Sequence, residues 1–278
     1  MRRIVGLTLF LVVGTVIGDA TECPRNPDAL GTSRVLVVDP VEHPRVGTLQ
    51  YRETLPLNDH EVVFTFDDGP IAPYTTRILD TLVSNCVKAT FFIVGDMANR
   101  SPELVRRAHE EGHTIGTHTE DHPFNIDALP IEQIEREIEK GIASVTKALG
   151  GVAVPAPFFR FPGLGRSEAA EKYLESQGIM IWSADVIPDD WKQISPEQVV
   201  ERSLDGLIRK RRGILLLHDI HERTAEALPI LLGRLKSAGF HVVQVVPAAP
   251  NRPKTATVQT QWILPAEENT VDPSSATE

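Results

Sequence analysis

Short apolar runs alternate with longer amphipathic stretches through the middle of this chain, and this alternation limits the fold more than any other feature. The runs are almost entirely apolar, as in "ATFFIV" at 89–94 and "GILLLH" at 213–218. Runs that are apolar throughout are typical of parallel strands buried on both faces. The sequence therefore predicts strands at 62–67, 89–94, 114–117, 158–161, 179–184, 214–217 and 241–246.

The stretches between these runs carry helix periodicity and helix-end signals. Pro102 and Pro196 each follow a serine at an N-cap position, and glycines such as Gly112 and Gly178 follow helical runs. A repeated βα unit with about seven parallel strands favours a single-domain α/β barrel over an open sheet, and catalytic residues of such barrels gather where strands end. The helices are expected at 74–85, 102–111, 130–149, 167–177, 196–211 and 224–238.

The first twenty residues differ from the rest of the chain. Residues 1–20 have a basic start, an apolar stretch from Ile4 to Ile17, and small residues at Gly18 and Ala20, which together predict an export signal. An uncleaved membrane anchor is the alternative, but the apolar part is shorter than a spanning helix requires. We therefore expect an exported protein, periplasmic or secreted, with no stable membrane span after signal cleavage.

Composition also indicates the domain limits. Residues 21–60 hold several prolines and are expected to be an irregular N-terminal segment, and residues 247–278 collect Pro, Ala, Thr and Glu and are expected to be a low-complexity tail. These limits leave residues 61–246 as the one folded domain. Two cysteines, Cys23 and Cys86, could pair in an oxidising compartment or remain free, and the sequence alone supports both states.

The charge balance excludes some partners. Lysine and arginine number 28 against 38 aspartates and glutamates, which gives a formal net charge of −10 at pH 7. Nucleic acid and anionic membranes need a basic face, so this balance argues against both and favours a neutral or cationic ligand.

Titratable residues gather at the ends of the predicted strands. Such a concentration suggests one shared site, since the carboxyl ends of parallel strands meet at the same end of a barrel. His109 and His113 lie elsewhere and are expected to be structural. The strand-end residues are Asp67 and Asp68, His118 and His122, Arg160, Asp185 and Asp190, and His218 and Asp219.

The segment "HTEDHPF" spaces His118 and His122 four residues apart, which puts both imidazoles on one face if the segment makes a helical turn. Asp68 could supply a third ligand from another strand. Three protein ligands with an open position are typical of a catalytic zinc site. Two surface histidines in a loop are the alternative that this spacing leaves open.

Five short motifs occur in a fixed order along the chain, and each is weak by itself. They are "TFDDG" at 65–69, "HTEDH" at 118–122, "RFPG" at 160–163, "DDW" at 189–191 and "LLH" at 216–218. Together, over roughly residues 60 to 246, they resemble the polysaccharide deacetylases with the NodB-homology domain, carbohydrate esterase family four.

The resemblance implies a distorted (β/α) barrel and a divalent metal, zinc or cobalt, held by Asp68, His118 and His122. It also implies that Asp67 is the general base. A turn whose aspartates merely cap a helix is the plain alternative for this carboxylate pair.

The remaining roles also come from the resemblance. Arg160 would keep the base ionised, and His218 would be the general acid with Asp190 as its partner. The alternatives are a surface ion pair for Arg160 and a structural strand-end role for His218. Because "DVIPDDW" is longer than the usual fourth motif, Asp185 and Asp189 compete with Asp190.

The substrate site is expected at Pro162, Gly163, Trp191 and Leu216, with core packing as the alternative for the last two. The family usually has an aromatic residue after the proline of the third motif, where this chain has Gly163, so one wall of the site is expected to be missing.

These observations predict a metal-dependent hydrolase that removes N-acetyl or O-acetyl groups from a polysaccharide or oligosaccharide. Two other functions stay open: a sugar-binding protein without turnover, and an amidohydrolase for small amides that are not sugars.

Overall fold

The computed structural model describes residue 23, residues 26–151 and residues 153–263. The predicted export signal at 1–20 and the last part of the predicted tail, 264–278, lie outside these residues.

Within the described part of the chain, nine strands form one parallel sheet in the order β1-β9-β3-β4-β5-β6-β7-β2, with β8 also paired to β3. The segment after β7 meets β8 through a parallel bridge from Val186 to Leu215. The run from β3 to β8 therefore returns on itself as a distorted barrel, which confirms the predicted fold class. The strands are β1 (Thr32–Val38), β2 (Arg45–Val46), β3 (Glu61–Asp67), β4 (Thr90–Ile93), β5 (Thr114–Thr117), β6 (Phe158–Phe159), β7 (Met180–Trp182), β8 (Gly213–His218) and β9 (His241–Pro247).

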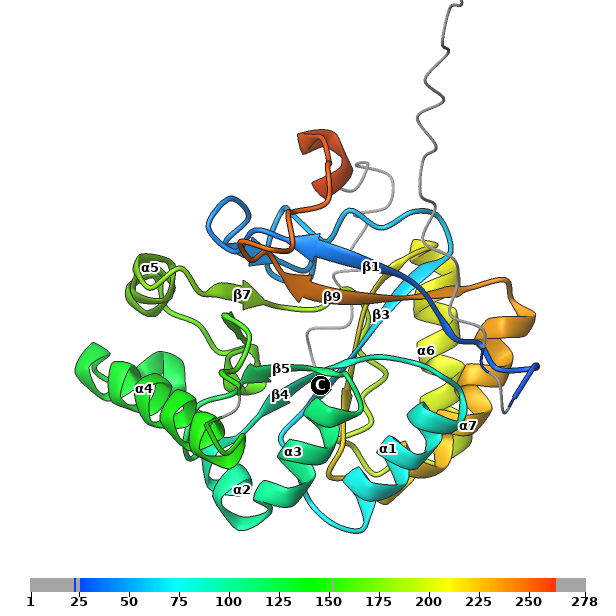
Figure 1. Ribbon diagram of the computed structural model, residues 1–278, viewed down its shortest axis with the longest axis horizontal. Helices are drawn as coiled ribbons and strands as arrows, with labels where there is room; N and C mark the ends of the chain where they lie inside the picture. Colours follow the sequence, from blue (N-terminus) through cyan, green and yellow to red (C-terminus); the bar gives the residue numbers. More distant parts are fainter. Residues whose placement is uncertain (1–22, 24–25, 152, 264–278) are drawn as a thin grey trace, which may run out of the picture.

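Most of the helices lie along the lower and left parts of the view in Figure 1, and the paired strands β1 and β9 run across its upper part. Pro102 and Pro196 occupy first-turn positions, as predicted. Ser195 makes a capping box with Gln198, whereas Ser101 stands at the N-cap position of its helix without a side-chain capping hydrogen bond. The helices are α1 (Tyr74–Ser84), α2 (Gly95–Arg100), α3 (Pro102–Glu110), α4 (Ile131–Ala148), α5 (Glu168–Ser176), α6 (Pro196–Lys210) and α7 (Glu222–Ser237), with short 3₁₀ turns η1 (Ile126–Ala128), η2 (Pro162–Leu164) and η3 (Gln259–Trp262).

The hydrophobic core lies on both faces of β3, which is buried along its whole length. Val62, Phe64 and Phe66 pack outward against the helices, whereas Val63 packs inward with Phe92 in the barrel interior. This alternation within a fully apolar strand is what a barrel wrapped in helices requires.

Residues 21–60 are not irregular throughout, in contrast to the expectation. Strand β1 pairs with β9 over six residues from Thr32 to Val38, and β2 pairs with β7. The partner of β1 lies about 200 residues further along the chain, so no local pattern of strand and turn predicts this pairing. Helix α2, six residues long, is a further element that the sequence did not predict.

The described part of the C-terminal segment also packs on the barrel. Trp262 is 2% exposed and stacks on His43 with ring centroids 3.5 Å apart. Cys23 forms a disulfide with Cys86 in the turn between α1 and β4, which decides the question that the sequence left open.

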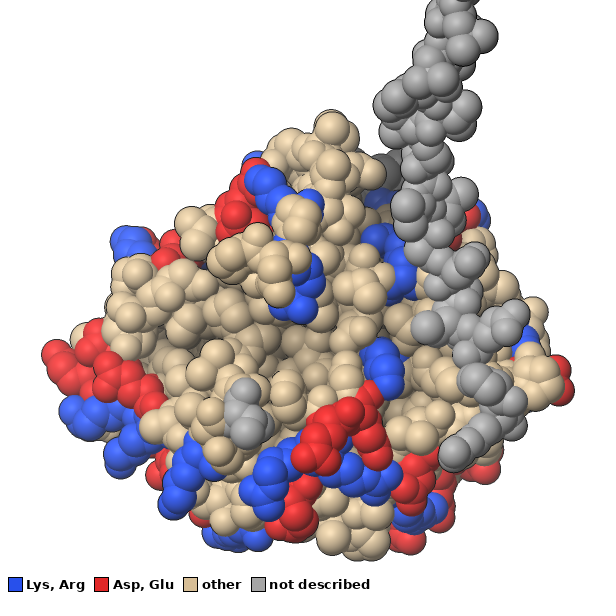
Figure 2. All heavy atoms as spheres, in the orientation of Figure 1, with Lys and Arg blue, Asp and Glu red and all other residues tan. Residues whose placement is uncertain are grey.

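Two surface features bear on partners. Positive and negative side chains are mixed along the lower edge of the face in Figure 2, over the helices. This mixture differs from the basic stripe of a nucleic-acid-binding face. Among the described residues, no helix has the length and apolar character needed to cross a membrane.

Candidate metal centre and acid–base site

The end of β3 brings two adjacent carboxylates to the carboxyl end of the barrel. Asp67 is the last residue of the strand and is 2% exposed. Asp68 follows with a positive φ of 79°, a left-handed conformation that non-glycine residues rarely adopt. Such conformations cluster at functional sites, where surrounding contacts maintain them.

Asp68 lies against both histidines of the second motif. Its Oδ1 is 3.3 Å from Nε2 of His118 and 3.1 Å from Nε2 of His122. One ligand atom from each of the three residues lies within 4.8 Å of the others, so the group could hold a metal ion. The structure therefore brings together the three residues that the sequence proposed as ligands.

The chemistry of this cluster fits a divalent metal. Oδ1 of Asp68 is buried and accepts no hydrogen bond of normal geometry, so it is available to a cation. The His118 ring contacts the Arg160 carbonyl oxygen through Nδ1 at 2.6 Å, which leaves Nε2 as the free nitrogen. Burial raises the pKa of Asp68, but the two imidazoles outweigh it and hold that pKa well below its usual range. Two imidazoles and a carboxylate are a common catalytic zinc ligand set.

Arg160 is fully buried and pairs with Asp67. Its Nη1 donates to Asp67 Oδ1 at 2.6 Å and to Thr65 Oγ1 at 2.8 Å, and its Nη2 donates to the Ser183 carbonyl at 2.9 Å. The guanidinium carbon also lies 4.3 Å from the centre of the Phe92 ring. Arg160 is thus an internal residue that orients Asp67, and the alternative of a surface ion pair is wrong.

His218 lies at the end of β8, directly opposite Asp67 in the β3–β8 register. Its Nδ1 contacts Asp190 Oδ1 at 2.7 Å, while Asp190 Oδ2 accepts hydrogen bonds from the His218 backbone at 2.8 Å and from Thr224 at 2.7 Å. Burial lowers the pKa of His218, but the Asp190 carboxylate overcomes this and raises it to about 9. The imidazole is therefore protonated near neutral pH.

The two competing aspartates have other partners. Asp185 is 2% exposed and accepts hydrogen bonds from Thr48, Thr54 and the Ile214 backbone. Asp189 forms ion pairs at the surface, including one with Arg202 at 2.8 Å. Asp190 is thus the partner of His218.

The expected substrate residues differ in exposure. Pro162 is buried at the start of η2, whereas Gly163 is exposed with a φ of 55°. Trp191 is 53% exposed and available to a ligand. Leu216 is 3% exposed and packs in the barrel interior.

Two residues near the centre had no role assigned from the sequence. Phe124 is 84% exposed, and its ring lies edge-on to His122 with centroids 5.0 Å apart. Asp219 is 1% exposed and contacts the backbone next to Asp68. In the sequence, Phe124 stands two positions after the second motif, and Asp219 is one of the strand-end carboxylates.

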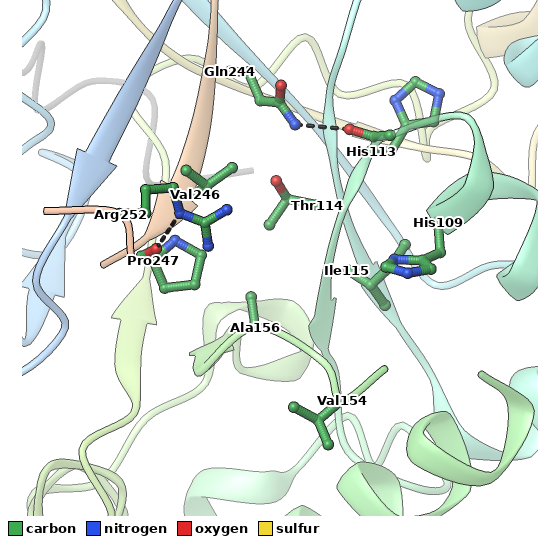
Figure 3. A pocket seen from close by; sticks show the side chains of 11 residues that line it. His109, His113, Thr114, Ile115, Val154, Ala156, Gln244, Val246, Pro247 and Arg252 are labelled. Atoms are coloured by element: carbon green, nitrogen blue, oxygen red, sulfur yellow. Dashed lines mark hydrogen bonds between the residues drawn. The ribbon is translucent and has the colours of Figure 1, made fainter. Parts of the chain in front are cut away.

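Two cavities lie apart from the proposed ligands. One, of about 260 Å³, opens between the start of β5 and the end of β9 and is lined by His109, His113 and Arg252, among others (Figure 3). His113 is 4% exposed and accepts a hydrogen bond from the Ala89 backbone, consistent with a structural role. The other, of about 390 Å³, is lined by Arg166 and by part of the segment 42–53, including Arg45 and Tyr51.

Fold and site together define a parallel α/β barrel with a candidate metal centre beside a buried Asp–Arg pair and a His–Asp pair. Residues 55–182 match the family model described as polysaccharide deacetylase. A peptidoglycan-N-acetylglucosamine deacetylase of Bacillus cereus is 34% identical over 196 residues, which are 69% of this chain and 89% of that protein. The chain belongs to the polysaccharide deacetylase family, which confirms the resemblance.

Two further comparisons agree. The peptidoglycan-N-acetylglucosamine deacetylase PgdA of Listeria monocytogenes is 36% identical over 186 residues, covering 66% of this chain. The matched part is only 38% of that relative's own length. Among solved structures, a peptidoglycan deacetylase of Bdellovibrio bacteriovorus superposes with a TM-score of 0.69 at 31% identity, covering 78% of this chain and 60% of that one.

Proposed function

We propose that this protein is a metal-dependent hydrolase that removes acetyl groups from N-acetylated sugars of a polysaccharide or oligosaccharide. One observation carries the proposal: Asp68, His118 and His122 cluster beside Asp67 and His218, which are partners in the β3–β8 register. A ligand cluster, a base and an acid therefore lie at one end of the barrel.

Asp68, His118 and His122 would hold the metal, which we propose to be zinc, with cobalt as the alternative. When bound, a divalent metal lowers the pKa of water and polarises an acyl oxygen. The other chemical steps belong to side chains of this chain.

Asp67 accepts the proton of the attacking water. A base must be aimed at the water, and the buried Arg160 guanidinium, whose Nη1 donates to Asp67 Oδ1 at 2.6 Å, holds the Asp67 carboxylate in place. Truncating one member of a buried pair leaves an uncompensated charge, so each depends on the other.

His218 donates a proton to the leaving nitrogen. Amide hydrolysis needs this step because an amine anion is a poor leaving group, whereas an ester can leave without it. Because the pKa of His218 is raised to about 9, the imidazole is protonated at neutral pH and can donate. An acid of this kind supports N-acetyl over O-acetyl substrates. Backbone N–H groups of the loop that follows Arg160 and contains Pro162 and Gly163 would stabilise the oxyanion of the reaction.

The substrate class is supported by the relatives, whose names specify peptidoglycan N-acetylglucosamine. Two exposed aromatic residues suit the flat face of a sugar ring: Phe124, whose ring lies against His122, and Trp191, which follows Asp190 in the chain. Either residue would replace the wall that an aromatic at position 163 usually provides, while Leu216 would close the inner end of an acetyl pocket.

Export to the periplasm or the medium is part of the proposal. The basic and apolar pattern of residues 1–20 supports it. The disulfide between Cys23 and Cys86 also supports it, because disulfides persist in oxidising compartments.

The altered third motif favours a second candidate, a sugar-binding protein without turnover. One experiment separates the two: the purified protein with added zinc is incubated with an N-acetylglucosamine oligomer, and free acetate is measured. We expect acetate release. Binding of the oligomer, with no acetate from chitin, peptidoglycan or acetylated xylan fragments, would support the second candidate instead.

A further inference from the structure

A buried carboxyl group beside the site has no part in the proposed reaction. Asp219 directly follows His218, and its side chain is almost fully buried, at 1% exposure. Its hydrogen bonds go to the segment that follows β3, which includes Asp68.

These bonds bracket Asp68. The Asp219 backbone N–H donates to the Asp67 carbonyl at 3.2 Å, and the Gly69 N–H donates to Asp219 Oδ1 at 2.9 Å. The residue that directly follows β8 thus binds the chain immediately before and immediately after Asp68.

A second layer of contacts holds the Asp219 carboxyl group itself. The Thr75 hydroxyl donates to Oδ2 at 2.7 Å and accepts from the Ile71 N–H at 2.8 Å. A Cβ atom at Gly69 would lie 2.1 Å from Asp219 Oδ2, so only glycine allows this approach.

Asp68, which lies between these two hydrogen bonds, has an unfavourable backbone conformation. Asp68 has a φ of 79°, and in that conformation its Oδ1 lies 3.1 and 3.3 Å from the two imidazoles. Left-handed conformations of non-glycine residues persist only where neighbouring contacts determine them. The two backbone bonds to Asp219 are such contacts.

We propose that Asp219 is a positioning residue that holds Asp68 in its left-handed conformation and thereby sets the metal affinity of the Asp68–His118–His122 centre. The inference rests on the proposed function only in requiring that this centre binds a divalent metal. In this role Asp219 connects the end of β8, which carries His218, to Asp68, the residue that follows β3.

Zinc affinity tests the proposal without any substrate. The dissociation constant is measured by competition with a chromophoric chelator for the wild type, Asp219→Ala and Asp219→Asn. We expect zinc binding to Asp219→Ala to be about 10- to 100-fold weaker, the usual effect of removing a group that orients a metal ligand. Asp219→Asn should stay within about threefold of wild type, because its amide oxygen can still accept the Gly69 N–H.

Asp185→Ala is the matched control. Asp185 is an equally buried carboxylate, 2% exposed, but it bonds to Thr48, Thr54 and Ile214 rather than to the segment around Asp68. Its loss should lower stability and leave the zinc affinity of the folded protein unchanged. Amide exchange of Gly69 in the metal-free protein gives a second readout, and it should be faster in Asp219→Ala than in wild type or Asp185→Ala.

Unchanged zinc affinity in Asp219→Ala, or an equal loss in Asp185→Ala, would overturn the proposal. If Asp219→Ala does not fold, Thr75→Val removes only the hydroxyl that holds the carboxyl group, and a several-fold loss of affinity is expected; no loss would again overturn it. A wild type that binds zinc but releases no acetate would contradict the proposed function alone. A wild type that binds no zinc would overturn both.

Discussion

Adjacent aspartates at the end of β3 serve different partners. Asp67 is bound by the guanidinium of Arg160, while Asp68 faces His118 and His122. The left-handed backbone at Asp68 accompanies this division, because consecutive residues of an extended strand point to opposite faces and could not serve one site without a change of conformation. At this scale, backbone conformation assigns the two carboxylates their separate roles.

The contact between His218 and Asp190 leads to a prediction about how activity depends on pH. The general acid must be protonated, so activity falls as the pH rises through the pKa of His218, which Asp190 raises to about 9. In Asp190→Asn that pKa should fall toward its ordinary value of about 6.5, and the alkaline limb of kcat/KM should move down by a pH unit or more.

Asp189→Asn is the control for this experiment, since the Asp189 carboxylate pairs with Arg202 at the surface instead. The pH–rate profiles of both variants on an N-acetyl substrate provide the measurement. An alkaline limb that stays in place in Asp190→Asn would remove His218 from the role of acid.

At the scale of elements, the sequence was most informative where a signal is local. Each of the predicted strands and helices is present within a few residues, because fully apolar runs, N-cap serines and terminal glycines all act over a few positions. Strand β1 was missed because its partner β9 is distant in sequence, and α2 because six residues are too few to show a helical period.

The site follows the same rule. Motif residues at strand ends could be found by position, and the structure brings Asp68 against His118 and pairs Arg160 with Asp67. The contacts of Asp219 with Gly69 and Thr75 span about 150 residues and depend on the β3–β8 register, which no periodicity reveals. Likewise, only the structure distinguishes Asp190 from Asp185.

The C-terminal turn η3 gives a prediction about stability. Trp262 is buried against His43 and the barrel interior, so Trp262→Ala should lower the free energy of unfolding by about 3–5 kcal/mol. Urea unfolding checks this value. Val258→Ala, in the same segment but 62% exposed, should change stability by less than about 0.5 kcal/mol. Equal small effects for both would show that the segment does not contribute to the fold.

For the whole molecule, the barrel joins parts of the chain that are far apart in sequence into one reacting site. β3 ends with Asp67 and is followed by Asp68, the loop after β5 supplies His118 and His122, and β8 ends with His218. The acidic net charge of −10 and the mixed surface in Figure 2 agree with a neutral sugar polymer better than with a polyanion.

The proposed reaction divides two tasks between neighbouring residues: Asp68 holds the metal and Asp67 takes the proton. Zinc content and acetate release, measured on the same preparations of wild type, Asp67→Asn and Asp68→Asn, test it directly. Asp67→Asn should keep its zinc and lose activity by about 100-fold or more, whereas Asp68→Asn should lose both. An Asp67→Asn protein without zinc, or one with zinc and full activity, would contradict the account.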